Sequence, residues 1–321
     1  MSARLEEMGA PLRELRATFE AEVEPHRRAL WNYCLRLTGS AWDAEDLVQE
    51  TMLRALARLA QLWQPVDPRA YLFRIATNTW IDQRRREVRA EFRELAAEAE
   101  PTEQMPEVRV EAQEALAHLV RVLTPLQRVV FLLCETLDFR AHEAASLLGT
   151  TEGAVKAALH RARRGLAAVG TAPEAAPPTR FLEAGEASEI VQRYVEAFNA
   201  RDPDAIAALL DERAVTTIVG SAEEIGREVS RKNSLAEWAA ETTEQWASAG
   251  LLEGKEVIFV LAHGTASRPC LYSLIELEAA AGAIHGHKIY FFSPELLEHA
   301  AAALGLEAST HGHQYPLFDA T

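Results

Sequence analysis

The chain carries the stretch AYLFRIATNTWIDQRRR at residues 70–86, and this stretch largely determines how the first half of the molecule folds. Its core-facing residues recur at helical spacing, which predicts an amphipathic helix. They are Leu72, Ile75, Ala76 and Thr79. Asp67 and Pro68 come directly before it, a capping residue and a first-turn proline. The helix ends in arginines beside aromatic residues, a combination suited to phosphates and unpaired bases. We therefore predict a helix that contacts nucleic acid.

A second basic helix follows about seventy residues later. Thr124-Pro-Leu-Gln127 has the pattern of a capping box with proline at the first helical position. Three helices are expected after it, at residues 127–137, 140–148 and 151–169, with Gly149 ending the second. A helix, a glycine turn and then a basic helix are typical of the helix-turn-helix motif. The sequence thus predicts contact with DNA at two places.

Composition narrows the class of protein. The chain has 321 residues, enough for two or three domains, and lacks an apolar run of the ~20 residues that a membrane span needs. Its first residues lack the apolar core of a signal peptide. Cys34, Cys134 and Cys270 are far apart in apolar contexts, as expected for buried thiols in a reducing compartment. We expect a cytoplasmic protein without a membrane partner, metal or cofactor.

The net charge of −15 is unevenly distributed. Residues 1–170 carry 23 Lys and Arg against 25 Asp and Glu, a net of −2. Residues 171–321 carry 10 against 23, a net of −13. Because local field rather than total charge governs attraction of phosphates, the acidic balance excludes nucleic acid for the C-terminal half alone.

Two stretches predict linkers. Residues 91–112 are rich in Glu and Ala and contain two prolines, and residues 170–187 contain three prolines among alanines. They divide the chain into domains at residues 1–90, 113–169 and 188–321. The first two domains are predicted to be all-α, with a helix at 19–38 ended by Gly39 and another at 43–59.

The third domain has a different pattern. A helical stripe near Tyr194 and a short helix capped by Asp202-Pro203 precede strand-like runs at 214–219, 257–262, 270–278 and 284–292. A helix near Trp238 interrupts these runs, and Ser293-Pro294 begins a last helix. Helices followed by an antiparallel sheet predict an α+β domain.

Three motifs in the N-terminal half resemble bacterial RNA polymerase sigma factors of the extracytoplasmic-function type. DAEDLVQETMLRA (residues 43–55) resembles their polymerase-binding helix, residues 70–86 their −10 recognition and melting helix, and residues 123–166 their −35-binding region. The segment at 191–210 resembles the start of a SnoaL-like, cone-shaped domain of the NTF2-like superfamily. The resemblance implies a multidomain protein with a region 2 bundle, a region 4 helix-turn-helix and an α+β regulatory domain.

The resemblance also implies partners, namely core RNA polymerase and promoter DNA, with a small ligand possible in the C-terminal domain. The −10 candidates are Phe73, Arg74, Asn78, Trp80, Arg84, Arg85 and Arg86. The −35 candidates are Glu152, Lys156, His160 and Arg161, with Arg163 and Arg164 for phosphate. The polymerase candidates are Asp43, Asp46, Gln49 and Glu50, an acidic helix face. No catalytic residue is proposed, because polymerase performs the chemistry.

Some features leave alternatives open. Many relatives have an arginine after the Val-Lys pair of the recognition helix, where this chain has Ala157-Ala158, so a base contact is expected to be missing. The pairs His285-Gly-His287 and His311-Gly-His313 would each place two imidazoles on one face of an extended strand, although pocket lining or plain surface is preferred to metal binding.

Two other functions are compatible with parts of the sequence. A helix-turn-helix regulator with a ligand-binding effector domain would explain the second and third domains but leaves residues 43–86 without a purpose. A DNA-binding module fused to an enzyme is the third interpretation, since proteins of the cone-shaped fold include cyclases and isomerases.

Overall fold

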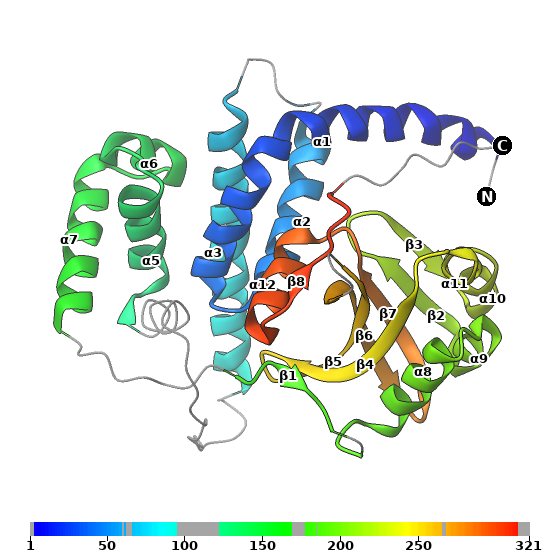
Figure 1. Cartoon of the computed structure of the whole chain (residues 1–321). Coiled ribbons are helices and arrows are strands. Elements are labelled where there is room, and N and C mark those ends of the chain that lie inside the picture. Colours follow the sequence, from blue (N-terminus) through cyan, green and yellow to red (C-terminus); the bar gives the residue numbers. More distant parts are fainter. Residues whose placement is uncertain are drawn as a thin grey trace. The chain divides into compact units, whose positions relative to one another are not determined.

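The computed structural model describes residues 3–59, 61, 66–94, 122–168, 177–183, 185–264 and 268–313. It divides into two compact units, Met1–Ala176 and Pro177–Thr321, and each is described by itself. We call the first the helical unit and the second the C-terminal unit (Figure 1). Among the described residues, no helix is both long and apolar enough to cross a bilayer.

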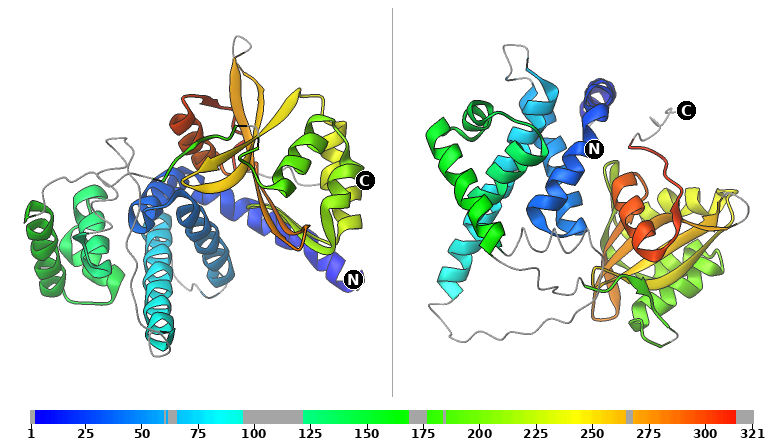
Figure 2. Two further views of the ribbon diagram at one scale, coloured as in Figure 1. Left: turned by 90° about the horizontal axis from the view of Figure 1, so that it is seen from below. Right: turned by 60° about the vertical axis from the view of Figure 1, so that its left-hand side comes forward.

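Three long helices open the helical unit. They are α1 (Ala3–Thr38), α2 (Ala41–Leu59) and α3 (Pro68–Glu94), and they pack side by side in Figures 1 and 2. Helix α1 begins earlier than the predicted residue 19 and ends, as predicted, before Gly39, whose φ of 85° favours glycine. In the core, Tyr33 and Thr77 share a hydrogen bond of 2.7 Å between their hydroxyl oxygens. The start of α3 is also as predicted, since the backbone N–H of Arg69 donates to the Asp67 carboxylate.

The predicted helix-turn-helix is formed by α5 (Pro125–Phe131), α6 (Ala141–Leu148) and α7 (Glu152–Ala168). The capping box is confirmed, because Gln127 N donates to Thr124 Oγ1 at 3.4 Å and Thr124 N donates to Gln127 Oε1 at 3.1 Å. The α-helix expected to reach residue 137 ends earlier and continues as a π-helical turn, η1 (Leu132–Thr136). Gly149 ends α6 with a φ of 63°.

The C-terminal unit contains one sheet with the strand order β1-β4-β5-β6-β7-β2-β3, and β8 pairs with β6. The strands are β1 (Arg180–Phe181), β2 (Leu210–Ile218), β3 (Ala222–Ile225), β4 (Gln245–Leu252), β5 (Lys255–His263), β6 (Pro269–Ala280), β7 (Ala283–Tyr290) and β8 (Glu307–Ala308). Most pairs are antiparallel as predicted, whereas β2–β7 and β6–β8 are parallel. Strand β1 lies within the stretch predicted as the second linker.

The composition of strand β4 makes this strand difficult to predict from the sequence. Its residues QWASAGLL include small side chains, which are weak strand formers. The fold requires one of them: a Cβ on Gly250 would lie 2.1 Å from the Phe259 ring and 2.8 Å from the carbonyl oxygen of Arg180. Glycine therefore lets β4 fit between β1 and the aromatic side chain of β5.

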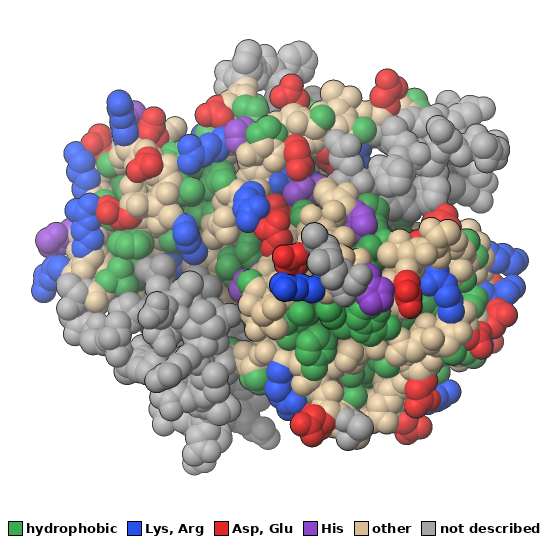
Figure 3. Space-filling model, viewed as in Figure 1, with side chains coloured by type: hydrophobic (Ala, Val, Ile, Leu, Met, Phe, Trp, Pro, Cys, Tyr) green, Lys and Arg blue, Asp and Glu red, His purple; other side chains and the backbone are tan. Residues whose placement is uncertain are grey.

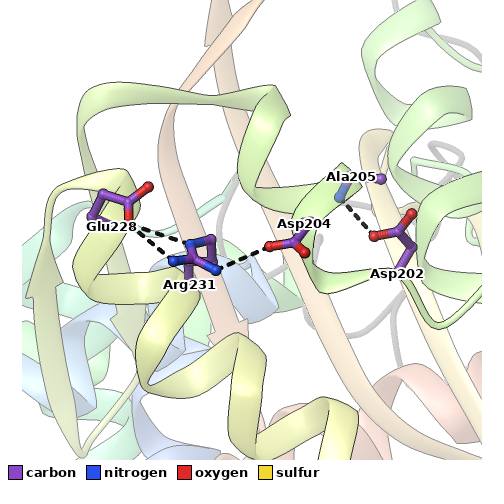
Figure 4. A network of polar contacts seen from close by, with 5 residues as sticks. All are labelled: Asp202, Asp204, Ala205, Glu228 and Arg231. Carbon is purple, nitrogen blue, oxygen red and sulfur yellow. Dashed lines mark hydrogen bonds and ion pairs between the residues drawn. The ribbon is translucent and has the colours of Figure 1, made fainter.

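Helices lie on both sides of this sheet (Figures 1 and 2). Helices α8 (Glu189–Asn199), α9 (Pro203–Leu209), α10 (Arg227–Lys232) and α11 (Ser234–Ala240) lie on one side, and α12 (Pro294–Leu304) lies on the other. Figure 4 shows that the Asp202 carboxylate caps α9 by accepting from Ala205 N, while Arg231 of α10 pairs with Asp204 and Glu228. The predicted fold class is confirmed: helical domains precede an α+β domain.

Candidate nucleic-acid interface and C-terminal cavity

Helix α7 separates a buried stripe from an exposed basic face. Val155, Ala158 and Ala162 are buried, at the i, i+3, i+7 spacing of a helix packed on a core. The six −35 candidates are all exposed: Glu152, Lys156, His160, Arg161, Arg163 and Arg164. Figure 3 shows Lys and Arg side chains following this helix. The predicted residues therefore share one accessible surface, here called the α7 face.

Two bases of the α7 face are engaged in surface ion pairs. Lys156 Nζ lies 2.7 Å from Glu152 Oε1, one helical turn earlier, and Arg163 pairs with Glu135. The ammonium group of Lys156 lowers the pKa of the Glu152 carboxyl. Exposed pairs of this kind contribute little, because water screens them and ordering both side chains costs entropy. Both bases can thus exchange a carboxylate for a phosphate at small cost.

Helix α3 places its candidates in two environments. Arg74, Asn78 and Arg86 are exposed and Arg84 is half-buried, while the side chain of Arg85 lies outside the described residues. Phe73 and Trp80 are 0% and 1% exposed. Both rings belong to the core in this conformation. On α3 they lie beside the buried side chains of Leu72, Ile75, Ala76 and Thr79. In this structure these two aromatics are not positioned to stack on a base.

Residues of the helix-turn-helix segment provide part of the burial of Phe73 and Trp80. The Phe73 ring lies 5.0 Å from Tyr33 of α1 and 6.3 Å from Phe139, which precedes α6. The Arg128 guanidinium from α5 lies 5.3 Å from the centre of the Trp80 ring. Trp80 Nε1 is buried without a hydrogen-bond acceptor among the described residues. Phe73 and Trp80 are therefore covered jointly by the bundle of α1, α2 and α3 and by the helix-turn-helix.

Two arginines join the bundle of α1, α2 and α3 to the helix-turn-helix by donating hydrogen bonds to backbone carbonyls. Arg128 Nη1 donates to the carbonyl oxygen of Leu37 at the end of α1, and Arg69 Nη2 donates to that of Leu137 at 3.1 Å. Helix C-termini carry unpaired carbonyls and partial negative charge, so a cation there is stabilising. Burial, followed by the nearby charge of Arg84, lowers the pKa of Arg128 to about 10, which leaves it protonated at neutral pH.

The polymerase candidates lie along one side of α2. Asp43 and Asp46 are exposed, and Gln49 and Glu50 are half-buried. Glu50 pairs with Arg54, and Gln49 donates to the buried carboxylate of Glu45 at 2.8 Å. Sequence reasoning missed Leu53, whose side chain is 61% exposed one turn after Glu50. An acidic helix face with an exposed leucine beside it is suited to docking a basic, partly apolar surface.

The C-terminal unit holds a cavity of about 590 Å³, within the range of small-molecule sites. Side chains from α8, α11 and the sheet line it, and most are apolar or aromatic. They are Tyr194, Phe198, Ile218, Ser234, Leu235, Glu237, Trp238, Ala240, Glu241, Gln245, Val260, Tyr272, Ser273, Ile275, Ile289, Phe291 and Phe292. A pocket in this domain was predictable from the sequence, but these residues were not, because they come from segments far apart in the chain.

A buried polar chain lies beside the cavity. Tyr194 Oη and His287 Nε2 are 2.9 Å apart, His287 Nδ1 lies 3.2 Å from Thr216 Oγ1, and Ser230 Oγ donates to Thr216 at 2.9 Å. Burial lowers the pKa of His287 to about 4 and raises that of Tyr194, so both stay neutral at pH 7. Each polar group has a partner, as buried groups require.

The two histidines of β7 lie in different environments. The β6–β7 register shifts between Glu278 and Ala279, and this irregularity leaves His285 exposed while His287 is fully buried. In the second pair, His311 stacks on Phe291 and His313 hydrogen-bonds to Glu295 at 2.7 Å. In the first pair the imidazoles therefore lie on different faces, and the second pair lies outside the described strands, so the condition of an extended strand is not met there. Among the described residues, no group of three His, Cys, Asp or Glu side chains is placed to hold a metal.

Comparisons with known proteins agree with the arrangement of the helical unit. The Sigma-70 region 2 model matches residues 23–90, and the Sigma-70 region 4 model matches residues 113–166. SigG of Mycobacterium tuberculosis, an ECF RNA polymerase sigma factor, is 34% identical over 232 residues, which cover 64% of this chain and 62% of SigG. The chain thus spans less than two thirds of the length of that relative.

Two further M. tuberculosis proteins are similar. SigL, another ECF RNA polymerase sigma factor, is 36% identical over 157 residues, which cover 47% of this chain and 87% of SigL. The crystal structure of the extracytoplasmic function sigma factor SigJ is 20% identical, with a TM-score of 0.31, and the match covers 84% of this chain and 95% of SigJ.

Proposed function

The chain belongs to the extracytoplasmic-function family of RNA polymerase sigma factors, and from that premise we propose that it directs core RNA polymerase to specific promoters and promotes initiation. The observation that carries the proposal is the α7 face, where six residues expected to meet the −35 element are exposed together over a buried stripe. A recognition helix needs this separation to enter a major groove.

In the proposed mechanism, the α7 face binds duplex DNA upstream. Lys156 and Arg161 approach base edges, and Arg163 and Arg164 hold phosphates. The exposed Arg74 and Asn78 of α3 contact the −10 strand. Base stacking by Phe73 or Trp80 would additionally require α3 to part from Phe139 and Arg128, which now cover these rings.

The proposed polymerase contact is the acidic side of α2, with Asp43, Asp46, Gln49 and Glu50 facing a basic surface. The test is binding of the full chain to core polymerase, together with transcription in vitro from a promoter library. A chain with Asp43→Lys and Glu50→Lys should lose polymerase binding. Glu22→Lys, an exposed acid on α1, is the matched control and should not.

A regulator that acts without replacing another sigma factor is the second candidate. It would use the helix-turn-helix and the cavity but leave α2 without a role. Such a protein would bind DNA in the absence of polymerase and would not support initiation by core polymerase alone. Failure of the chain to bind core polymerase would favour this candidate over the sigma factor.

We further propose that the C-terminal unit modulates activity by sensing a small ligand in its cavity, and that it performs no catalysis. Residues 177–321 carry 10 Lys and Arg against 22 Asp and Glu, a net of −12, so the unit repels DNA. Promoter binding by residues 1–176 should exceed that of the full chain, and unchanged or weaker binding would refute a restraining role. Turnover of a bound molecule by the purified protein would instead favour the enzyme interpretation.

A further inference from the structure

The cavity of the C-terminal unit has aromatic walls. Phe198 of α8 and Trp238 of α11 lie 4.5 Å apart between ring centres, and Tyr272 of β6 and Phe291 lie 5.3 Å apart. Flat aromatic surfaces favour flat apolar ligands, and they also attract cations to their faces. The shape and the walls therefore favour a ring system over a flexible chain.

The charges of the lining have one sign. Among the described residues that line the cavity, the acidic side chains are Glu237 and Glu241, and no Lys or Arg is among them. Glu237 is exposed, which places it at the open side, and Glu241 is half-buried and accepts a hydrogen bond from the Tyr272 hydroxyl. Burial, followed by Glu241, raises the pKa of Tyr272 to about 12, so it remains a neutral donor.

Nearby cationic groups do not offset these carboxylates. The Arg201 guanidinium lies 5.7 Å from the Trp238 ring centre, but it donates to backbone carbonyls around the end of α11, including those of Trp238 and Glu241. Its charge therefore compensates the helix C-terminus. His311 packs on Phe291 at 4.1 Å between ring centres, and burial lowers its pKa against the opposing effect of the Glu241 charge, which disfavours a cation on this ring.

We propose that the cavity binds a planar, mostly apolar amine, and that Glu237 and Glu241 select the cation against neutral and anionic molecules of the same shape. The proposal rests on the ligand-sensing role proposed above. A bound ring system would take water away from the two carboxylates, and desolvating a carboxylate is costly unless a cation accompanies it. An amine supplies that charge, whereas a carboxylate ligand would add repulsion.

The test uses the full chain and three matched probes: anthracenylmethylamine, anthracenylmethanol and anthracenecarboxylate. Dissociation constants are measured by calorimetry at neutral pH and low salt, without polymerase or DNA. We expect the amine to bind about tenfold more tightly than the alcohol, as ~1.4 kcal/mol of charge attraction would give, and the carboxylate to bind most weakly. Equal or tighter binding of the carboxylate, or no binding of any probe, would overturn the proposal.

Variants identify the residues responsible. The double variant Glu237→Gln and Glu241→Gln should remove the preference for the amine, so that the amine and the alcohol bind with similar dissociation constants. Glu244→Gln is the matched control, because Glu244 lies on the same segment with an 82% exposed side chain outside the lining. Trp238→Ala should weaken all three probes at least tenfold, and a thermal melt checks that each variant is folded.

An unchanged preference in the double variant would refute the role of the carboxylates. The result is independent of the sigma-factor proposal, which is tested by binding to core polymerase. Probe binding with no polymerase binding would overturn the proposed function alone, and the reverse would overturn the ligand class alone.

Discussion

The helical unit presents its candidate functional side chains on the surface, whereas the C-terminal unit encloses its own. On α7 and α2, charged residues are exposed opposite a buried stripe. In the C-terminal unit, His287 is fully buried and the cavity is lined by helices and strands distant in sequence. Surface sites of the first kind attract a polyanion or a protein through charge, and interior sites of the second kind select a molecule by shape.

Phe73 and Trp80 are exceptions to this pattern. They are candidate −10 contacts in the helical unit, but their side chains are buried in its core. We expect Trp80→Ala to lower the free energy of unfolding by ~3–5 kcal/mol, as removal of a buried tryptophan does. Asn78→Ala, two residues earlier and exposed, should keep stability and weaken binding to a single-stranded −10 oligonucleotide. Urea denaturation and oligonucleotide titration measure the two effects. A stable Trp80→Ala protein with weak oligonucleotide binding would instead place the indole in the DNA site.

The buried His287 provides a test of the C-terminal unit. Burial lowers its pKa from 6.5 to about 4, so between these values the unfolded chain binds a proton that the folded chain does not. Stability from this group is therefore complete above about pH 6.5 and is lost as pH falls toward 4, by ~3 kcal/mol in all.

Urea denaturation between pH 7 and pH 4 measures that loss. The slope with pH should be smaller in His287→Gln than in His285→Gln, an exposed neighbour on the same strand. Equal slopes in the two variants would show that His287 is accessible to protons and that the unit opens there.

Adjacent alanines of α7 give the sharpest contrast between the two environments. Ala157 is exposed and Ala158 is 1% exposed. Ala157→Arg should leave stability unchanged and strengthen binding to a −35 duplex by ~1 kcal/mol or more, since it restores a base-reading side chain beside Lys156. Ala158→Arg should instead unfold the helix-turn-helix, because it buries a charge. Thermal melts and duplex titrations separate these outcomes, and tighter duplex binding by a stable Ala158→Arg protein would contradict this assignment of faces.

Much of this contrast was predictable from sequence, and the limits have physical reasons. The α7 face, the capping box at Thr124 and the glycine ends of α1 and α6 follow from helical periodicity and local hydrogen bonding, which depend on neighbours in the chain. The cavity lining, β4 and the irregularity at His285 depend on tertiary pairing. Gly250 fits because Phe259 lies opposite, and no local pattern records that.

The aromatic residues of α3 are a second case in which tertiary contacts, and not the local sequence, determine the role of a side chain. An aromatic beside arginines is equally compatible with a base-stacking surface and with a core covered by a cationic side chain. The structure places Trp80 within cation–π distance of both Arg84 and Arg128, and Arg128 comes from a helix more than forty residues away. The burial of Trp80 therefore depends on a contact between α3 and α5, which the sequence of α3 alone does not encode.

The smallest expected effect concerns one phosphate contact on the α7 face. Replacing the exposed Arg164 by glutamine should weaken binding of the full chain to any −35 duplex by a similar factor, whatever its sequence. The dependence of log affinity on log salt concentration should become shallower by ~0.9, because one fewer counterion is released. Arg36→Gln, an exposed base at the end of α1, serves as the control and should leave the slope unchanged. A loss confined to one promoter sequence would mean that Arg164 reads a base, and the α7 face would then read sequence over a longer stretch than proposed.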